Sequence, residues 1–111
     1  MRKAYQQISD IIKVFDNPEK AALNMTFHLS KLVEETGEMA QSINKLNGRK
    51  KKKGESKKDI LANIGEEAVD AIQCLMAIAI NAGVDYDTLK KTLFEKNDKF
   101  ATNKIEEPSE N

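Results

Sequence analysis

The chain has 111 residues, which is enough for one domain and hardly for two. Its 18 basic and 18 acidic side chains give a formal net charge of zero, so no overall field is expected to hold nucleic acid or an anionic membrane. Hydrophobic residues account for 40% of the chain, charged residues for 32% and aromatic residues for only 5%, a balance typical of an all-helical soluble protein.

Neither a signal sequence nor a membrane span is expected. The N-terminal stretch MRKAYQQISD contains no apolar signal-peptide core. The longest nearly apolar run, residues 71–80, includes Gln73 and is far shorter than the roughly 20 residues that span a bilayer. Cys74 is the single cysteine, which excludes an intrachain disulfide and favours a buried, reduced thiol. These features predict a cytoplasmic protein.

The N-terminal half of the chain predicts two helices. Apolar residues three and four positions apart predict the first helix over residues 2–15. In the following DNPEK, Asn17 is a suitable cap and Pro18 suits the first position of a new helix. A near-heptad apolar stripe then predicts a long second helix over residues 19–46. Residues 47–58, rich in lysine, interrupt the pattern and predict a flexible basic loop.

The C-terminal half predicts two more helices. The third covers residues 59–82 and is apolar nearly all round from residue 68 to residue 80, as in a helix that is buried on most sides. Gly83 is a suitable C-cap, and Asp85 a suitable N-cap for a fourth helix over residues 86–101, which carries Asn97 on its inward stripe. The tail, residues 102–111, is polar and is expected to fray.

These elements predict a single all-α domain over residues 1–101, built as a four-helix bundle. The connections between the first and second helices and between the third and fourth helices are short, which favours antiparallel packing of each pair. The third helix offers more apolar surface than one small bundle can cover, which predicts a homo-oligomer.

Two clusters of carboxylates interrupt the most apolar helical stretches. Glu35 and Glu38 are three positions apart in KLVEETGEMA, and Glu67 and Asp70 are three apart in NIGEEAVDAI, so each pair projects from one side of its helix. On a helical wheel, Glu35 lies about 40° from the apolar stripe at Met39. Unpaired carboxylates that are partly buried cost several kcal/mol each. Few basic residues lie in these segments, and carboxylate-only ligation selects a hard cation such as Mg²⁺ or Mn²⁺.

The alternative interpretation is a solvated acidic face held by ordinary ion pairs. A lone Glu-x-x-Glu motif usually has that explanation. Two such motifs on two helices, each embedded in apolar sequence, favour a metal site. Glu34 and Glu66 are interpreted either as supporting residues around that site or as exposed partners of lysines.

The residues KLVEETGEMAQSI and EEAVD, on either side of a basic loop, resemble the all-α NTP pyrophosphohydrolase superfamily, and especially its MazG-like members. The shared signature is Glu-x-x-Glu on one helix and Glu-x-x-Asp on the next. The resemblance covers about residues 27–97. Dimeric dUTPases are usually longer, with duplicated acidic motifs. Phosphoribosyl-ATP hydrolysis would require specialised ribosyl contacts. A compact MazG-like enzyme is therefore favoured over both of these relatives.

The resemblance implies an enzyme in which Glu35, Glu38, Glu67 and Asp70 bind Mg²⁺, with Mn²⁺ as a substitute. A metal-activated water would cleave a (d)NTP between its α- and β-phosphates to give a (d)NMP and pyrophosphate, in nucleotide-pool housecleaning. Glu35 or Glu38 would take the proton of that water. Compact relatives build their sites across subunits, so the resemblance also implies a homodimer or a homotetramer.

The candidate substrate-binding residues, the basic loop and the single histidine each have two interpretations. Related proteins contact substrate through a Lys/Asn-containing stretch of the fourth helix, so the resemblance makes Lys96 and Asn97 candidate substrate-binding residues, together with Lys31. A solvated or packing role is the alternative. The basic loop suits either a lid over a triphosphate or a solvated charge run. His28, the single histidine, is a half-buried structural residue or a stacking partner for a base.

Two other functional classes compete with the enzyme. One is a non-catalytic helical interaction module that oligomerises through the third helix and binds no metal. The other is a nucleic-acid binder that uses the basic loop, against which the zero net charge and the lack of aromatic residues in that loop argue.

Overall fold

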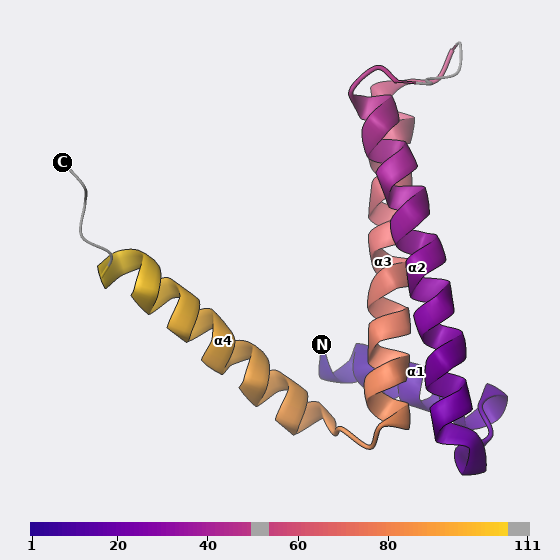
Figure 1. Cartoon of the computed structure of the whole chain (residues 1–111), viewed down its shortest axis with the longest axis vertical. Coiled ribbons are helices and arrows are strands. Elements are labelled where there is room, and N and C mark those ends of the chain that lie inside the picture. Colours follow the sequence, from indigo (N-terminus) through magenta and orange to yellow (C-terminus); the bar gives the residue numbers. More distant parts are fainter. Residues whose placement is uncertain (50–53, 107–111) are drawn as a thin grey trace.

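The computed structural model describes residues 1–49 and 54–106, and within these ranges every regular element is a helix (Figure 1). The all-α class predicted from the sequence is therefore correct. The basic segment 50–53 and the last residues, 107–111, lie outside the described residues. Among those described, no single helix is long and apolar enough to cross a membrane; only the bent pair Lys57–Asn81 and Tyr86–Asn103, which meet at 120°, reaches that length and composition.

The first half follows the prediction closely. Helix α1 spans Arg2–Phe15. The chain then restarts as predicted, because the Asn17 side chain accepts the backbone N–H of Glu19 at 2.9 Å. The first turn after this cap is a short 3₁₀ helix, η1, over Pro18–Lys20, and helix α2 follows over Ala21–Leu46.

The second half differs at its ends. Helix α3 spans Lys57–Asn81 and begins earlier than predicted, because the hydroxyl of Ser56 accepts the N–H of Asp59 at 3.1 Å and caps it. Helix α4 spans Tyr86–Glu106, so the start of the tail that was expected to fray is helical.

The turn between α3 and α4 has the predicted chemistry. Gly83 adopts a φ of +83°, which favours glycine at the end of a helix. The carboxylate of Asp85 accepts the N–H of Thr88 at 2.8 Å and caps α4.

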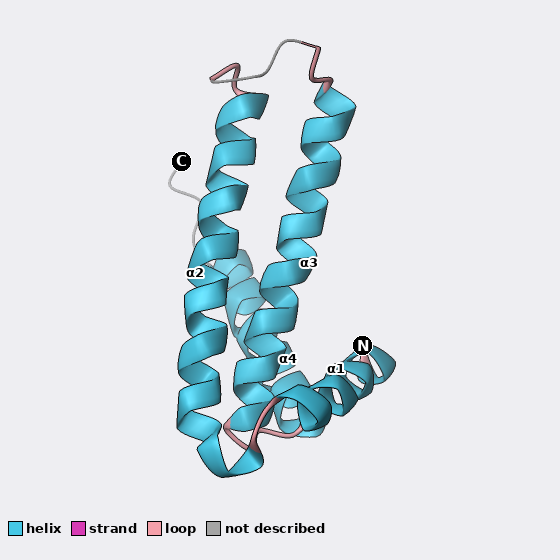
Figure 2. Cartoon of the chain, turned by 90° about the vertical axis from the view of Figure 1, so that its right-hand side faces the viewer, coloured by secondary structure: helices cyan, strands magenta, loops and turns pink. Residues whose placement is uncertain are grey.

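Helices α2 and α3 form an antiparallel pair that packs along its length, and α1 crosses one end of it (Figure 2). The buried apolar residues lie along this arrangement: Ile12, Ile60, Ala71, Cys74 and Ala77. Cys74 is a free thiol, as expected. The core is small for a chain of this length.

Helix α4 points away from the α2–α3 pair (Figure 1). Helix α1 holds the start of α4 in place: the Tyr5 hydroxyl donates to the carbonyl of Val84, just before the helix, at 2.7 Å, and Arg2 forms a 2.7 Å ion pair with Asp87 in its first turn. The radius of gyration is 18.1 Å, against about 13 Å for a compact domain of about 100 residues. One chain alone therefore does not close into a four-helix bundle.

Candidate functional site

The two acidic motifs lie on facing stretches of α2 and α3. Of the four residues, Glu35 is buried, with 7% of its surface exposed, and Glu67 is half-buried. Glu38 and Asp70 are exposed. Two carboxylates thus lie within the helix pair and two lie at its edge.

Glu67 is fixed by a residue that sequence reasoning missed. The hydroxyl of Ser42, itself buried, donates to Glu67 Oε1 at 2.7 Å across the two helices. The other oxygen, Oε2, is buried and has no hydrogen-bond partner among the described residues. Ser42 follows Glu38 by four positions, so this helical spacing was the signal available in the sequence.

Glu35 has a similar unpaired oxygen. Its Oε2 is buried and has no partner within the described ranges 1–49 and 54–103. Burial raises the pKa of this carboxyl, and the nearby charges of Glu38 and Asp70 raise it further. Lys31 acts in the opposite direction. Glu35 therefore interacts with acidic groups from both helices.

The donor set fits a hard cation in part. Two buried carboxylate oxygens without partners, on facing helices, are groups that Mg²⁺ would satisfy. In the part of the chain that is described, however, no three Asp, Glu, His or Cys side chains converge closely enough to hold a metal ion. The closed four-carboxylate cage expected from the sequence is not preformed in one chain.

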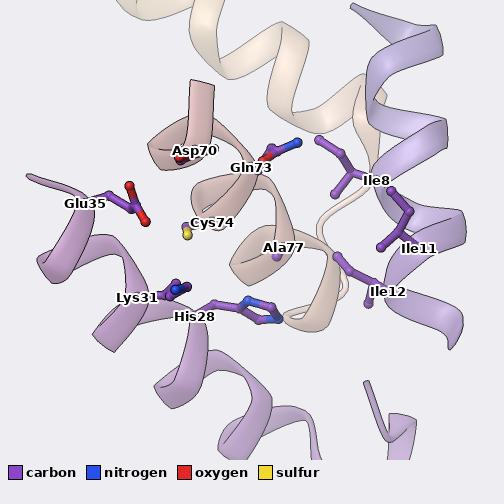
Figure 3. Close-up of a pocket in the computed structure, with 10 residues that line it drawn as sticks. All are labelled: Ile8, Ile11, Ile12, His28, Lys31, Glu35, Asp70, Gln73, Cys74 and Ala77. Atoms are coloured by element: carbon purple, nitrogen blue, oxygen red, sulfur yellow. The ribbon is translucent and has the colours of Figure 1, made fainter. Parts of the chain in front are cut away.

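A pocket of about 380 Å³ opens beside Glu35, between α1, α2 and α3 (Figure 3). Glu35 and Asp70 lie toward one end, and Ile8, Ile11 and Ile12 of α1 line the opposite wall (Figure 3). The pocket therefore joins a carboxylate end to an apolar end.

The predicted substrate-binding residues fall into two groups. Lys31 lines this pocket, and its ammonium lies 3.9 Å from the Glu34 carboxylate. Glu34 is therefore an exposed partner of a lysine, which is one of the two interpretations that the sequence offered for it. Lys96 and Asn97 are exposed on α4, which leads away from the acidic residues (Figure 1). A single chain does not bring them to the site.

His28 also lines the pocket and is half-buried, as the sequence suggested. It hydrogen-bonds Asp16 at 2.7 Å, a contact that the sequence did not reveal because the two residues lie on different elements. Of the basic loop, the structure describes the two ends, and Glu55 in the second of them forms a 3.4 Å ion pair with Lys45 in the last turn of α2. The lid interpretation rests mainly on residues outside the described ranges.

Comparison with family models, with curated proteins and with solved structures returned no match in any of the three searches.

Proposed function

We propose that this protein is a Mg²⁺-dependent nucleoside triphosphate pyrophosphohydrolase of MazG-like type, acting in cytoplasmic nucleotide-pool housecleaning. The observation that carries the proposal is the pair of buried, unpartnered carboxylate oxygens of Glu35 and Glu67 on facing helices. Such oxygens are costly unless a ligand satisfies them. The adjoining pocket, with one carboxylate end and one apolar end, suits a phosphate chain attached to a nucleoside.

In this proposal Glu35, Glu38, Glu67 and Asp70 hold the cation, and Ser42 orients Glu67. When bound, Mg²⁺ or Mn²⁺ neutralises phosphate charge and lowers the pKa of a coordinated water. Glu35 or Glu38 accepts the proton of the attacking water. Lys31 at the pocket wall contributes positive charge toward the triphosphate.

The site is completed by assembly. Several large apolar side chains of α4 are exposed in one chain, with exposed fractions of 55% for Leu93, 55% for Phe94 and 72% for Phe100. Exposed apolar side chains gathered on one helix indicate an interface. We propose that α4 packs against a second copy in a homodimer or a homotetramer, closing the four-helix bundle. Lys96 and Asn97 would then reach a site of the assembly.

The test is release of pyrophosphate from a panel of NTPs and dNTPs, with Mg²⁺ and with EDTA. Wild-type protein is expected to give a monophosphate and pyrophosphate only with the metal, and Glu38→Gln is expected to lose at least about 100-fold in kcat. Glu66→Gln is the matched control, because Glu66 is an exposed neighbour in the acidic motif of α3. Equal activity of the Glu38 variant, or no turnover of any nucleotide, would contradict the proposal.

A second candidate is a non-catalytic helical interaction module, favoured by the exposed apolar residues of α4. It predicts assembly without metal binding. Titration calorimetry with Mg²⁺ separates the two, because the module gives no heat of binding while its sedimentation still indicates an oligomer.

A further inference from the structure

The pocket ends at a network of polar side chains that joins three elements of the fold. Asp16 is the residue after α1. Its Oδ2 forms hydrogen bonds with two groups, Nε2 of His28 at 2.7 Å and Nδ2 of Asn81 at 2.9 Å. Asn24 donates to Asn81 Oδ1 at 3.0 Å and to the carbonyl of Asn17 at 2.7 Å. Asn81 also donates to the carbonyl of Ala77 at 2.9 Å. The amide groups therefore have one consistent orientation.

This network fixes the hydrogen-bonding state of the His28 ring. Burial by itself raises the pKa of Asp16, but the hydrogen bonds from Asn81 and His28 outweigh burial and hold that pKa below its ordinary value. An ionised carboxylate only accepts hydrogen bonds. Nε2 must therefore carry the proton, and in the neutral ring Nδ1 is an acceptor.

Nδ1 has no hydrogen-bond partner among the residues that the structure describes. The ring projects from α2 toward the end of α3 at the side of the pocket away from Glu35 (Figure 3). His28, Lys31 and Glu35 follow one another along the same side of α2, and His28 lies roughly 10 Å along the helix axis from Glu35. If phosphates lie at the carboxylates, the nucleoside lies at His28.

We propose that His28 binds the nucleoside part of the substrate through Nδ1, which accepts a hydrogen bond from a sugar hydroxyl or a base amino group, and that Asp16 and Asn81 are positioning residues. This inference rests on the proposed nucleotide chemistry of the pocket. It goes further by assigning a hydrogen-bonding role to a nitrogen that the acidic motif does not include.

Because the chain has one histidine, ¹⁵N-labelled histidine gives an NMR signal that belongs to His28 alone. At alkaline pH the expected state is a protonated Nε2 and a bare Nδ1. Adding a nucleoside triphosphate with Mg²⁺ to the Glu38→Gln variant is expected to shift the Nδ1 resonance. A protonated Nδ1 in the free protein, or an Nδ1 resonance that no nucleotide shifts, would overturn the inference.

Asp16→Ala tests the positioning role, because it removes the acceptor that holds the ring proton on Nε2. The expected result is a loss of the preference for the Nε2-protonated tautomer and a rise of about tenfold in KM, with kcat little changed. The control is Asp10→Ala, the same change at an exposed residue of α1 outside the network. A loss of stability without any change of tautomer or KM would assign the network to structure alone.

Nucleotides that lack one of the two possible donors identify which group donates the hydrogen bond to Nδ1. If a sugar hydroxyl donates, 2′,3′-dideoxynucleotides no longer shift Nδ1. If a base amino group donates, cytidine and adenosine triphosphates shift it while the uridine compound does not. A shift of the Nδ1 resonance without hydrolysis by the wild type would overturn the proposed activity and support the nucleoside site. Hydrolysis without any shift of the Nδ1 resonance would support the activity and overturn the nucleoside site.

Discussion

The seam between α2 and α3 contains two polar clusters that differ in one respect. At the end near α1, the network of Asp16, His28 and Asn81 pairs its buried groups with one another. In the acidic stretch, Glu35 and Glu67 each keep one buried oxygen without a partner in the described chain. Both clusters interrupt apolar packing, but only the acidic one leaves its desolvation uncompensated.

The difference separates buried polar groups that are paired within the fold from buried carboxylate oxygens that lack a partner. A satisfied polar network stabilises the native arrangement, and losing one member leaves the others unpaired. An unsatisfied carboxylate lowers stability until something binds it. Substitutions in the two clusters should therefore have opposite effects on the free energy of unfolding.

The largest expected effect is at Glu67. Glu67→Gln is expected to reduce nucleotide hydrolysis at least about 100-fold, because it removes a charge from the proposed cation site. Without metal, this variant should be more stable than the wild type, because a neutral amide costs less to bury than a carboxylate with an unpartnered oxygen. At Mg²⁺ concentrations about 100 times its Kd, the wild type alone should gain about 2.7 kcal/mol. Thermal melts of the wild type and of the variant, with Mg²⁺ and with EDTA, measure these two differences in stability. If Mg²⁺ stabilises the two proteins equally, the cation does not bind at the acidic cluster.

The next effect in size concerns the satisfied network. Asp16→Ala is expected to lower the free energy of unfolding by about 1–3 kcal/mol, because it leaves His28 and Asn81 without an acceptor. Asp10→Ala, an exposed change on the same helix, should stay within about 0.5 kcal/mol of the wild type. Urea unfolding at neutral pH measures both. An Asp16 variant as stable as the Asp10 control would show that the network contributes nothing to the fold.

The pH dependence should separate the clusters as well, because their carboxyl pKa values move in opposite directions. The pKa of Asp16 is lowered despite burial, by Asn81 and His28, so its contribution is fully present above the ordinary aspartate value of about 3.9 and is lost as the pH falls through the native value. The pKa of Glu35 is raised by burial, then by Glu38 and Asp70. Its contribution is present below the ordinary glutamate value of about 4.3 and is lost as the pH rises through the native value.

Urea unfolding between about pH 3 and pH 8 measures this difference, with reference to the ordinary carboxyl range. The stability of Glu35→Gln relative to the wild type should increase as the pH rises through that range. The stability of Asp16→Asn relative to the wild type should decrease over the lower part of the same range. Parallel curves for the two variants would contradict the distinction between the clusters.

The sequence predicted the local features of these regions and missed those that depend on distant partners. Helix periodicity, the Asn17 cap and the Gly83 turn are local, and the structure confirms them. The spacing of the acidic residues also placed both pairs on facing stretches of α2 and α3. Local patterns do not reveal which oxygen finds a partner, so the bond from Ser42 to Glu67 was not predicted.

The direction of α4 shows the same limit. Its apolar stripe predicted an inward face, yet Leu93 and Phe100 are exposed in one chain. A stripe specifies that a face will be covered and does not identify what covers it. The family resemblance made Lys96 and Asn97 candidate substrate-binding residues. Their role now depends on the proposed assembly.

The smallest effect concerns Gly65, which lies in α3 beside the acidic residues. Alanine at an interior helix position is favoured over glycine by about 0.5–1 kcal/mol, and a Cβ at Gly65 meets no atom within 4 Å. Gly65→Ala should therefore raise the stability of one chain slightly. Gly83→Ala is the contrasting change, because its φ of +83° makes alanine unfavourable by roughly 1–2 kcal/mol.

Urea unfolding combined with sedimentation makes the Gly65 variant informative about the acidic cluster. Gly65 lines a shallow hollow with Glu66, Val69 and Asp70. If a second copy or a substrate fills that hollow, the added methyl group should weaken assembly or raise KM while the isolated chain becomes more stable. A variant that gains stability and keeps both assembly and KM would mean that the hollow stays open to water, and that the ligand of the acidic cluster enters from the pocket on the other side, beside His28.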